Sequence, residues 1–363
     1  MLTIIDKKDE IKSLKKELIE SLQNPGTSIY IMGRNNYSTI VIKQLIEEGI
    51  QINGVIDDTN KSVSSFMGID VCRTDQVPRN STVICCVIEG RLHSALKRLK
   101  LSDISGILTY FDLYLFDEEK YPAPIFFGGN VIDIENNQEE YHWLASILDD
   151  QVSLDTLERL IDFRFNCNVE AMSGFTYRVD QQYFDQIVLK DEDEVFVDCG
   201  GYDGQTTLKF INEHPGYKSA YVLEPSPELY ENIKTIMAPY PRVKVLPYAA
   251  YREDCELLFD STMDSASSIS VQGNVNVSGA KLDTLIDGPI TFLKFDVEGA
   301  ELDALIGSEN IIRSYKPKIA VCVYHDQSHF WKIPRLILKY CSEYKVSLRH
   351  YTEGTFETVM YFY

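Results

Sequence analysis

Three side chains that can accept a proton follow two neighbouring strands of the predicted C-terminal sheet. Asp296 and Glu298 come at the end of the apolar run at 290–296, and His325 follows the apolar run at 318–324. In open α/β sheets, ligands bind at the carboxyl ends of the strands. Because an imidazole titrates near neutral pH, it suits the removal of a proton from a reacting hydroxyl group. The pattern predicts catalytic roles for all three residues, with His325 as the general base.

Each of these residues also has another interpretation. His325 could be a hydrogen-bonded loop histidine, and Glu298 could bind the acceptor hydroxyl or cap the following helix. Two carboxylates and an imidazole could also hold a divalent cation. Because such groups commonly meet at strand ends without an ion, the sequence predicts no metal site here.

A glycine turn in the same unit predicts a cradle for a nucleotide-like cofactor. Residues 195–206 read V-F-V-D-C-G-G-Y-D-G-Q-T, which indicates a buried strand, a tight turn and the start of a helix. Glycine lets the backbone approach a ligand closely, and a helix start offers free N–H groups. Glu224 ends the next strand, about 20 residues beyond the turn, where an acid can accept hydrogen bonds from both hydroxyls of a ribose. Ala249 follows the third strand and leaves room for a flat ring.

The elements that must position these residues alternate between strands and helices. After strands at 195–198, 220–224 and 243–246, residues 256–283 predict an inserted hairpin around a Ser-rich loop at 261–270. The core strands resume at 290–296 and 318–324, a helix follows at 333–341, and the last strands are at 346–350 and 358–362. Residues 138–166 have helical periodicity and predict a cap on this unit.

An earlier part of the chain predicts a second, smaller α/β unit. Residues 28–110 alternate strands and helices, with one strand ending at Gly33 and the next at Asp57. Asp57 could hold a ribose, but the turn after Gly33 lacks the two further glycines of a dinucleotide fingerprint. We therefore expect a degenerate nucleotide fold used for docking or for homo-oligomer contacts, with ligand binding as the alternative.

The composition of the 363 residues excludes several classes of protein. The formal net charge of −20 argues against nucleic-acid binding, which needs clusters of Lys and Arg. No apolar run approaches the roughly 20 residues that span a bilayer, and residues 1–9 lack a signal-peptide pattern. The eight cysteines have no metal-site spacing and indicate reduced thiols. We expect a soluble, cytoplasmic protein without a membrane span.

The segment 294–301, K-F-D-V-E-G-A-E, resembles the K-x-D-V-E-G-A-E signature of the FkbM family of methyltransferases. The turn at 198–204 and the Glu224-Pro225 pair also resemble that family, with Gly201 where the family usually has Ala. Further similar segments lie at 323–325, 331–334, 348–351 and 357–361, so the resemblance covers roughly residues 180–363. The first unit lies outside it and resembles the nucleotide-fold domains at the front of some sugar-modifying enzymes.

The resemblance implies an α/β protein of two Rossmann-like domains, the second a class I methyltransferase fold whose last strand is antiparallel. The predicted domains are 1–120, to which the sequence assigns no role, and 121–363, with a helical extension at 121–185 and a catalytic core at 186–363. The implied cofactor is S-adenosylmethionine, with Asp198 and the glycines around its methionine part, Glu224 on its ribose and Ala249 near its adenine. The residues implied to bind it are Asp198, Gly200, Tyr202, Gly204, Glu224, Ala249 and Asp296.

The resemblance further implies methylation of an oxygen, on a sugar hydroxyl of a glycan or a nucleotide-sugar intermediate. The Ser-rich loop at 261–270 and a loop at 325–331, with His329 and Trp331, are expected to shape a pocket for this small-molecule or glycan acceptor. Two other functions stay open: an NAD-dependent nucleotide-sugar-modifying enzyme that uses the first unit, and a non-catalytic two-domain binding protein.

Overall fold

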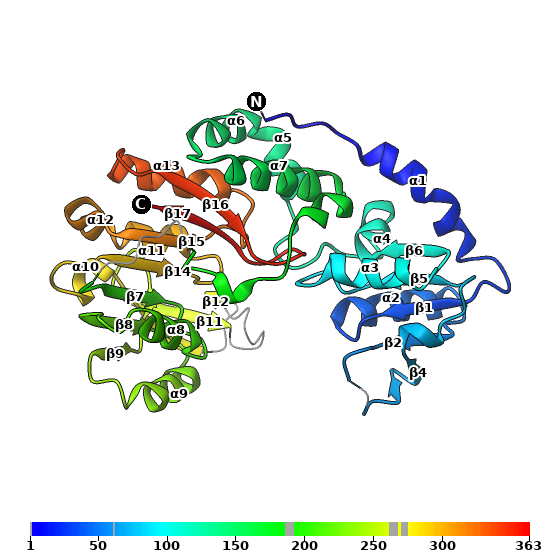
Figure 1. Ribbon diagram of the computed structural model, residues 1–363, viewed down its shortest axis with the longest axis horizontal. Coiled ribbons are helices and arrows are strands. Elements are labelled where there is room, and N and C mark those ends of the chain that lie inside the picture. The colour runs from blue at the N-terminus through cyan, green and yellow to red at the C-terminus, as the bar shows by residue number, and fades with distance from the viewer. Residues whose placement is uncertain (1, 61, 186–191, 261–267, 270–274) are drawn as a thin grey trace.

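The computed structural model describes residues 2–60, 62–185, 192–260, 268–269 and 275–363. In these residues the chain forms two α/β units joined by a group of helices (Figure 1). The N-terminal unit is drawn in blue and cyan, and the C-terminal unit in green to red. The first residues lie beside the joining helices, where the backbone N–H of Lys7 donates to Asn166 Oδ1 at 2.8 Å.

The N-terminal unit is built on a sheet with the strand order β3-β4-β2-β1-β5-β6 among the described residues. Every pairing in this sheet is parallel except that of β3 with β4. The predicted small parallel α/β fold is therefore confirmed. Its strands are β1 (Ile29–Met32), β2 (Gly54–Ile56), β3 (Ser65–Phe66), β4 (Ile69–Cys72), β5 (Thr82–Cys85) and β6 (Gly106–Thr109). Its helices are α1 (Lys8–Ser21), α2 (Asn36–Glu47), η1 (Thr74–Gln76), α3 (Leu92–Leu101) and α4 (Tyr110–Phe116).

The joining helices are fastened to one edge of the C-terminal sheet. Asp150 caps the third of them by accepting the backbone N–H of Ser153, and Ser153 Oγ in turn accepts the backbone N–H of Leu348. Arg349 forms an ion pair with Asp150 at 2.9 Å. The same polar residues thus cap the N-terminus of α7 and hydrogen-bond to the edge strand of the sheet. The elements are α5 (Asn130–Asn136), α6 (Gln138–Ile147), α7 (Gln151–Asn166), η2 (Val169–Gly174) and η3 (Val179–Gln181).

The C-terminal unit has the strand order β16-β17-β15-β14-β7-β8-β9. Its strands are parallel except β17, which is antiparallel to both β15 and β16, so the predicted antiparallel final strand is confirmed. The strands are β7 (Val195–Cys199), β8 (Ser219–Leu223), β9 (Val243–Leu246), β14 (Phe292–Phe295), β15 (Lys318–Cys322), β16 (Val346–His350) and β17 (Thr358–Phe362). The helices are α8 (Gln205–Glu213), α9 (Pro227–Met237), α10 (Leu282–Leu285), α11 (Glu301–Ile306), α12 (Glu309–Tyr315) and α13 (His329–Tyr340).

The predicted insertion forms a small separate sheet, β10-β13-β11-β12. Strand β11 (Cys255–Asp260) pairs antiparallel with β13 (Val275–Ala280), which confirms the expected hairpin. Strands β10 (Ala249–Ala250) and β12 (Ser268–Ile269) complete the sheet. Apart from Ser268 and Ile269, the Ser-rich loop predicted at 261–270 lies outside the described residues.

The segment 351–357, between β16 and β17, joins the C-terminal unit to the N-terminal one. The Glu353 carboxylate accepts the backbone N–H of Ser94 at 2.6 Å and its hydroxyl at 2.8 Å, at the start of α3. A Cβ added at Gly354 would overlap the carbonyl oxygens of Ile88 and Glu89. The two units therefore meet backbone to backbone at this segment. Within the described residues, no helix has the length and apolarity needed to cross a membrane.

Candidate active site

The fold brings together the three catalytic residues predicted from the sequence. Asp296 follows β14 directly, Glu298 lies in the turn before α11, and His325 follows β15. His325 Nε2 lies 3.3 Å from Glu298 Oε2 and 3.6 Å from Asp296 Oδ1. The His325 side chain is fully buried, whereas the two carboxylates keep about a fifth of their surface exposed (21% each). One face of the cluster is thus open to a ligand.

Glu301, which the sequence analysis did not select, holds His325 from its other side. Its Oε1 lies 2.8 Å from His325 Nδ1 and also accepts the backbone N–H groups of Val297 and Gly299. Its Oε2 lies 3.2 Å from His329 Nδ1. Because an ionised carboxylate can only accept, Nδ1 must donate to it, and this fixes the orientation of the imidazole ring.

The charges in this cluster shift one another's protonation. Burial alone would lower the pKa of His325, but the carboxylates of Glu301 and Glu298 raise that pKa well above its usual value. Burial favours neutral Glu301, yet His325 and His329 hold its pKa well below the usual range. Burial also raises the pKa of Glu298 against the effect of His325. An imidazolium cannot accept a proton, so His325 acts as a base only after its own proton has left.

Asp296, Glu298 and His325 are also the residues that could hold a metal ion. One ligand atom from each lies within 4.8 Å of the others. These three atoms, Asp296 Oδ1, Glu298 Oε2 and His325 Nε2, are buried and have no hydrogen-bond partner among the described residues. Buried polar atoms are rarely left in this way. The cluster is therefore prepared to receive a ligand, a proton or a cation.

The predicted glycine turn lies at the neighbouring strand end. Gly200 has φ +87°, and a Cβ there would overlap the carbonyl oxygen of Asp296. Only glycine can occupy this position, because the turn after β7 touches the end of β14. Gly204, at φ +78°, precedes α8 and offers its start no side-chain cap. The backbone N–H of Gln205 donates to Asp203 Oδ1 at 3.0 Å, which leaves the N–H groups after it to meet an anionic group of a ligand.

Glu224 lies beside this turn, as the register of β7 and β8 requires. Cys199 pairs with Leu223, so the residues that follow each of them are neighbours. Glu224 Oε2 accepts the backbone N–H of Tyr202, and Oε1 that of Ser226, both at 2.9 Å. Burial raises the pKa of Glu224, although these two hydrogen bonds oppose the rise. Each oxygen keeps a lone pair for a further donor such as a ribose hydroxyl.

The other residues expected at the cofactor lie around the same strand ends. Tyr202, half-exposed at φ +47°, is part of the turn. Ala249 is buried in β10, which pairs with β13. Asp198 is fully buried, and its carboxylate forms an ion pair with Lys294 Nζ at 2.9 Å and accepts the Thr207 hydroxyl. Asp198 thus contacts the other side of the turn and positions its backbone.

Lys294 is a second residue that the sequence analysis left out of the site. It stands opposite Asp198 in the β7–β14 register and donates to the carbonyl of Gly200 at 2.7 Å. Burial alone would lower the pKa of Lys294, but Asp198 raises it above its usual value. Both Lys294 and Glu301 belong to the eight-residue segment 294–301. The segment carried the family resemblance, but the sequence analysis selected only Asp296 and Glu298 from it as functional residues.

Two more residues of the cluster come from distant parts of the chain. The Tyr183 hydroxyl donates to Asp296 Oδ2 at 2.6 Å and leaves Oδ1 facing His325. Glu357 lies close enough to feel the charge of Asp296, and burial together with that charge raises the pKa of Glu357 to about 7. Glu357 begins the family-like segment 357–361, but neither that segment nor the residues around Tyr183 indicated a role at the site, because only the folded sheet brings both residues there.

Two residues expected to line a sugar pocket are engaged elsewhere. His329 and Trp331 were predicted in a loop, but they lie in α13, and this prediction is wrong. His329 is buried against Glu301, and the indole N–H of Trp331 donates to Asp133 Oδ1 at 3.2 Å. The loop is shorter than expected because the Asp326 carboxylate accepts the N–H and hydroxyl of Ser328 just before the helix begins.

Aromatic side chains flank His325. The rings of Phe126 and Tyr324 lie 4.8 and 4.0 Å from the imidazole, centroid to centroid. Phe356, from the 351–357 segment, packs against both of them. The imidazole therefore has little freedom to turn.

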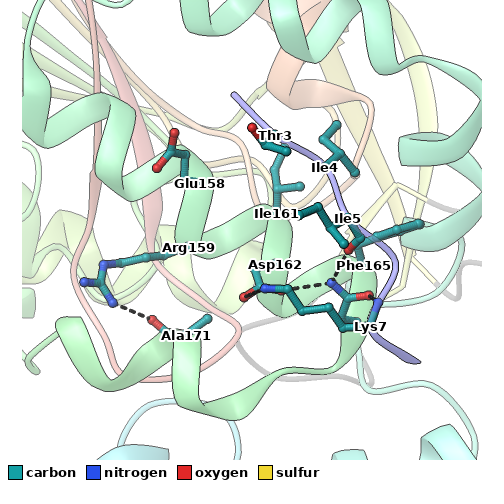
Figure 2. A pocket seen from close by; sticks show the side chains of 11 residues that line it. Thr3, Ile4, Ile5, Lys7, Glu158, Arg159, Ile161, Asp162, Phe165 and Ala171 are labelled. Atoms are coloured by element: carbon teal, nitrogen blue, oxygen red, sulfur yellow. Dashed lines mark hydrogen bonds and ion pairs between the residues drawn. The ribbon is translucent and has the colours of Figure 1, made fainter. Parts of the chain in front are cut away.

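Two cavities lie away from this cluster. One, of about 290 Å³, opens at the carboxyl ends of the N-terminal strands and is lined by Arg34, Asp57, Arg91 and Arg98 among others. The second, of about 330 Å³, lies between residues 3–7 and α7, and Figure 2 shows the ion pair of Lys7 with Asp162 at its wall. Neither cavity is lined by Asp296, Glu298 or His325.

Comparison with known proteins agrees with this geometry. Residues 198–348 match the family described as "Methyltransferase FkbM domain". This part of the chain is therefore similar to an FkbM methyltransferase domain. The match begins at Asp198 and contains Glu224, Asp296, Glu298 and His325. The predicted resemblance is confirmed.

One solved structure shares the fold over nearly its whole length. The methyltransferase FkbM from Methylobacillus flagellatus superposes with a TM-score of 0.74 at 21% identity, covering 98% of each chain, so the similarity includes the N-terminal unit. An rRNA methylase from Streptococcus thermophilus matches at 13% identity and a TM-score of 0.31, over 47% of this chain and 86% of its own. Fibrillarin from Aeropyrum pernix, solved with S-adenosylmethionine, matches at 12% identity and a TM-score of 0.32. The match covers 48% of this chain and 67% of fibrillarin. No curated protein matches the sequence.

Proposed function

We propose that the protein transfers a methyl group from S-adenosylmethionine to a hydroxyl group of a sugar, in a glycan or nucleotide-sugar intermediate. One observation carries this proposal: a cofactor-shaped turn and a cluster of buried, unpartnered proton acceptors lie on adjoining strand ends of an FkbM methyltransferase domain. Their adjacency would hold a methyl donor and a hydroxyl acceptor in contact.

The cofactor would lie across the ends of β7, β8 and β9. Gly200, Tyr202 and Gly204 would surround its methionine part, with the N–H groups after Gln205 at the start of α8 facing the carboxylate. Asp198 would support the same turn through Lys294, and Glu224 would accept the ribose hydroxyls. Ala249 would leave space for the adenine, and Asp296 would border the methyl group.

The acceptor hydroxyl would bind at Asp296, Glu298 and His325. As its oxygen attacks the methyl carbon, the carbon–sulfur bond breaks and the electron pair stays on sulfur. The acceptor must also lose its proton, either to a neighbouring group with a free lone pair or to water. The unpartnered atoms of these three residues support their catalytic role and favour an oxygen acceptor. A sugar is the hydroxyl-rich acceptor that we propose.

Two measurements test this proposal. Calorimetric titration with S-adenosylmethionine should give one binding event, and absence of binding would contradict the proposed cofactor. Mass spectrometry across a panel of nucleotide sugars and glycans should then find a product heavier by one methylene, with the mark on oxygen. If His325→Ala transfers methyl at the full rate, His325 has no catalytic role.

A second candidate is favoured by the cavity of the N-terminal unit, which has the position of a nucleotide site in such sheets. An NAD-dependent nucleotide-sugar-modifying enzyme would use it. Asp57 gives this candidate less support, because its carboxylate already accepts from Arg34, Thr59 and Asn60. Quenching of protein fluorescence by NAD would favour it over a non-catalytic binding protein.

A further inference from the structure

The strongest unexplained feature of the molecule is the set of three unpartnered atoms at the acceptor side of the site. Asp296 Oδ1, Glu298 Oε2 and His325 Nε2 face one another and lack hydrogen-bond partners among the described residues. The His325 side chain is completely buried, so water cannot compensate its ring nitrogen. Three facing polar atoms of this kind indicate that a ligand or an ion binds between them.

We propose that Asp296, Glu298 and His325 bind a divalent cation of the Mg²⁺ or Mn²⁺ type. This inference rests on the methyl transfer proposed above and names what activates its acceptor.

The distances between the three ligand atoms are slightly longer than those around a bound cation. Ligand atoms at about 2.1 Å from an octahedral ion lie about 3 Å apart when they are neighbours. The separations of His325 Nε2 from the two carboxylate oxygens are 3.3 and 3.6 Å. One ligand atom from each of the three residues lies within 4.8 Å of the others, so small side-chain movements would let all three share one ion. Three protein ligands leave further positions for water and for an acceptor oxygen.

The surrounding residues fix the ligand atoms as a metal site requires. Glu301 accepts from Nδ1 of His325, which leaves the Nε2 lone pair directed at the two carboxylates. Tyr183 donates to Oδ2 of Asp296 and leaves Oδ1 free. Glu301 is itself held by the backbone N–H groups of Val297 and Gly299. Carboxylate–histidine pairs of this kind commonly orient metal ligands.

A proton is a poorer occupant than a cation. A hydrogen on Nε2 can point at either Glu298 or Asp296, and the other oxygen then stays unpartnered. With Glu301 and Glu357 also close, several carboxylates surround one imidazole ring. A divalent cation can bind the oxygens of Asp296 and Glu298 at the same time, and its charge offsets the repulsion between the two carboxylates.

The bound ion would take part in the reaction through the acceptor. The acceptor oxygen would enter an open coordination position, and its proton would pass to solvent water. The resulting alkoxide attacks the methyl carbon, the carbon–sulfur bond breaks, and sulfur keeps the electron pair. The balance is one proton released for each methyl group transferred, without an oxidant or a reductant.

Mn²⁺ is the probe, because it accepts both oxygen and nitrogen ligands and its free ion is counted by electron paramagnetic resonance. The full-length protein, treated with a chelator and dialysed, should bind one Mn²⁺. Asp296→Asn and Glu298→Gln should each weaken binding about 100-fold, and Glu301→Gln, which touches no ion, about 10-fold. Asp326→Asn is the matched control and should bind normally, because its carboxylate serves Ser328.

The outcomes separate this inference from the proposed function. Absence of Mn²⁺ binding, or binding unchanged in both Asp296→Asn and Glu298→Gln, overturns the cation site even when S-adenosylmethionine binds. Full methyl transfer in excess chelator overturns it as well. Conversely, Mn²⁺ binding that depends on these residues supports the site even if S-adenosylmethionine fails to bind and the proposed function falls.

Discussion

The turn after β1 in the N-terminal unit and the turn after β7 in the C-terminal unit have the same plan, and each has an acid after the next strand. Asp57 Oδ1 accepts hydrogen bonds from Thr59 and Asn60, and Oδ2 forms an ion pair with Arg34, so its charge is already neutralised within the protein. Glu224 accepts one backbone N–H on each oxygen and keeps free lone pairs. The comparison indicates that free hydrogen-bonding capacity, rather than position in the fold, makes Glu224 a better candidate than Asp57 for binding a ribose.

The largest contrast is expected from alanine at the two turn glycines. In Gly200→Ala, the new Cβ would overlap the carbonyl oxygen of Asp296, and we expect a loss of at least about 5 kcal/mol or failure to fold. In Gly33→Ala, the Cβ would lie 3.1 Å from a methyl group of Val87, and the cost should be about 1–2 kcal/mol. Urea unfolding measures both. Equal losses would break the comparison.

The next contrast concerns the side chain that ties each turn to a neighbouring strand. Lys294→Met leaves the buried charge of Asp198 uncompensated, at an expected cost of about 3–5 kcal/mol. Asn35→Ala removes a cap of α2 and a hydrogen bond to the carbonyl of Cys86, at about 1–2 kcal/mol. Adding Asp198→Asn to Lys294→Met should recover part of the loss, because the unpaired charge is then gone. No recovery would contradict the ion pair's role.

The acids themselves give a binding contrast. Glu224→Gln keeps the size of the side chain but removes its charge, and we expect S-adenosylmethionine to bind about 10- to 100-fold more weakly. Asp57→Asn should leave the affinity unchanged. Calorimetry on both variants decides, with circular dichroism to confirm that each is folded. Equal affinities for Glu224→Gln and the wild type would remove Glu224 from the cofactor site.

The smallest contrast is in pH dependence. Burial raises the pKa of Glu224, so acidification protonates it earlier than an exposed glutamate, and the affinity for S-adenosylmethionine should fall as the pH drops through this raised pKa. Glu224→Gln should abolish this dependence. Despite its burial, the hydrogen bonds from Thr59 and Arg34 lower the pKa of Asp57 to about 2. Its stabilising contribution is present above its ordinary pKa and is lost as the pH falls toward 2, which acid unfolding of Asp57→Asn should reveal.

The sequence predicted the parts of the site that depend on strand ends. Asp296, Glu298 and His325 were placed together because parallel strands end at one edge of the sheet. Glu301 escaped this reasoning, because its side chain turns back from a helix toward the strand end. Lys294 meets Asp198 only through the register of β14 on β7, which no local pattern reveals. Trp331 was misplaced because the start of α13 could not be read from its sequence.

Other predictions await experiment. The domain boundaries, the cytoplasmic location and a homo-oligomer through the N-terminal unit stay predictions. The identity of the acceptor as a small molecule or a glycan is also a prediction.

The 351–357 segment limits how freely the two units can be recombined. Glu353 and Gly354 engage the N-terminal unit, while Phe356, two residues on, packs against the aromatic rings that flank His325. A chimera that replaces the first unit with another nucleotide fold would remove the carbonyls and N–H groups that seat this segment. The loss would reach His325 through Phe356. Evolution, like protein engineering, would therefore have to exchange the first unit together with this segment.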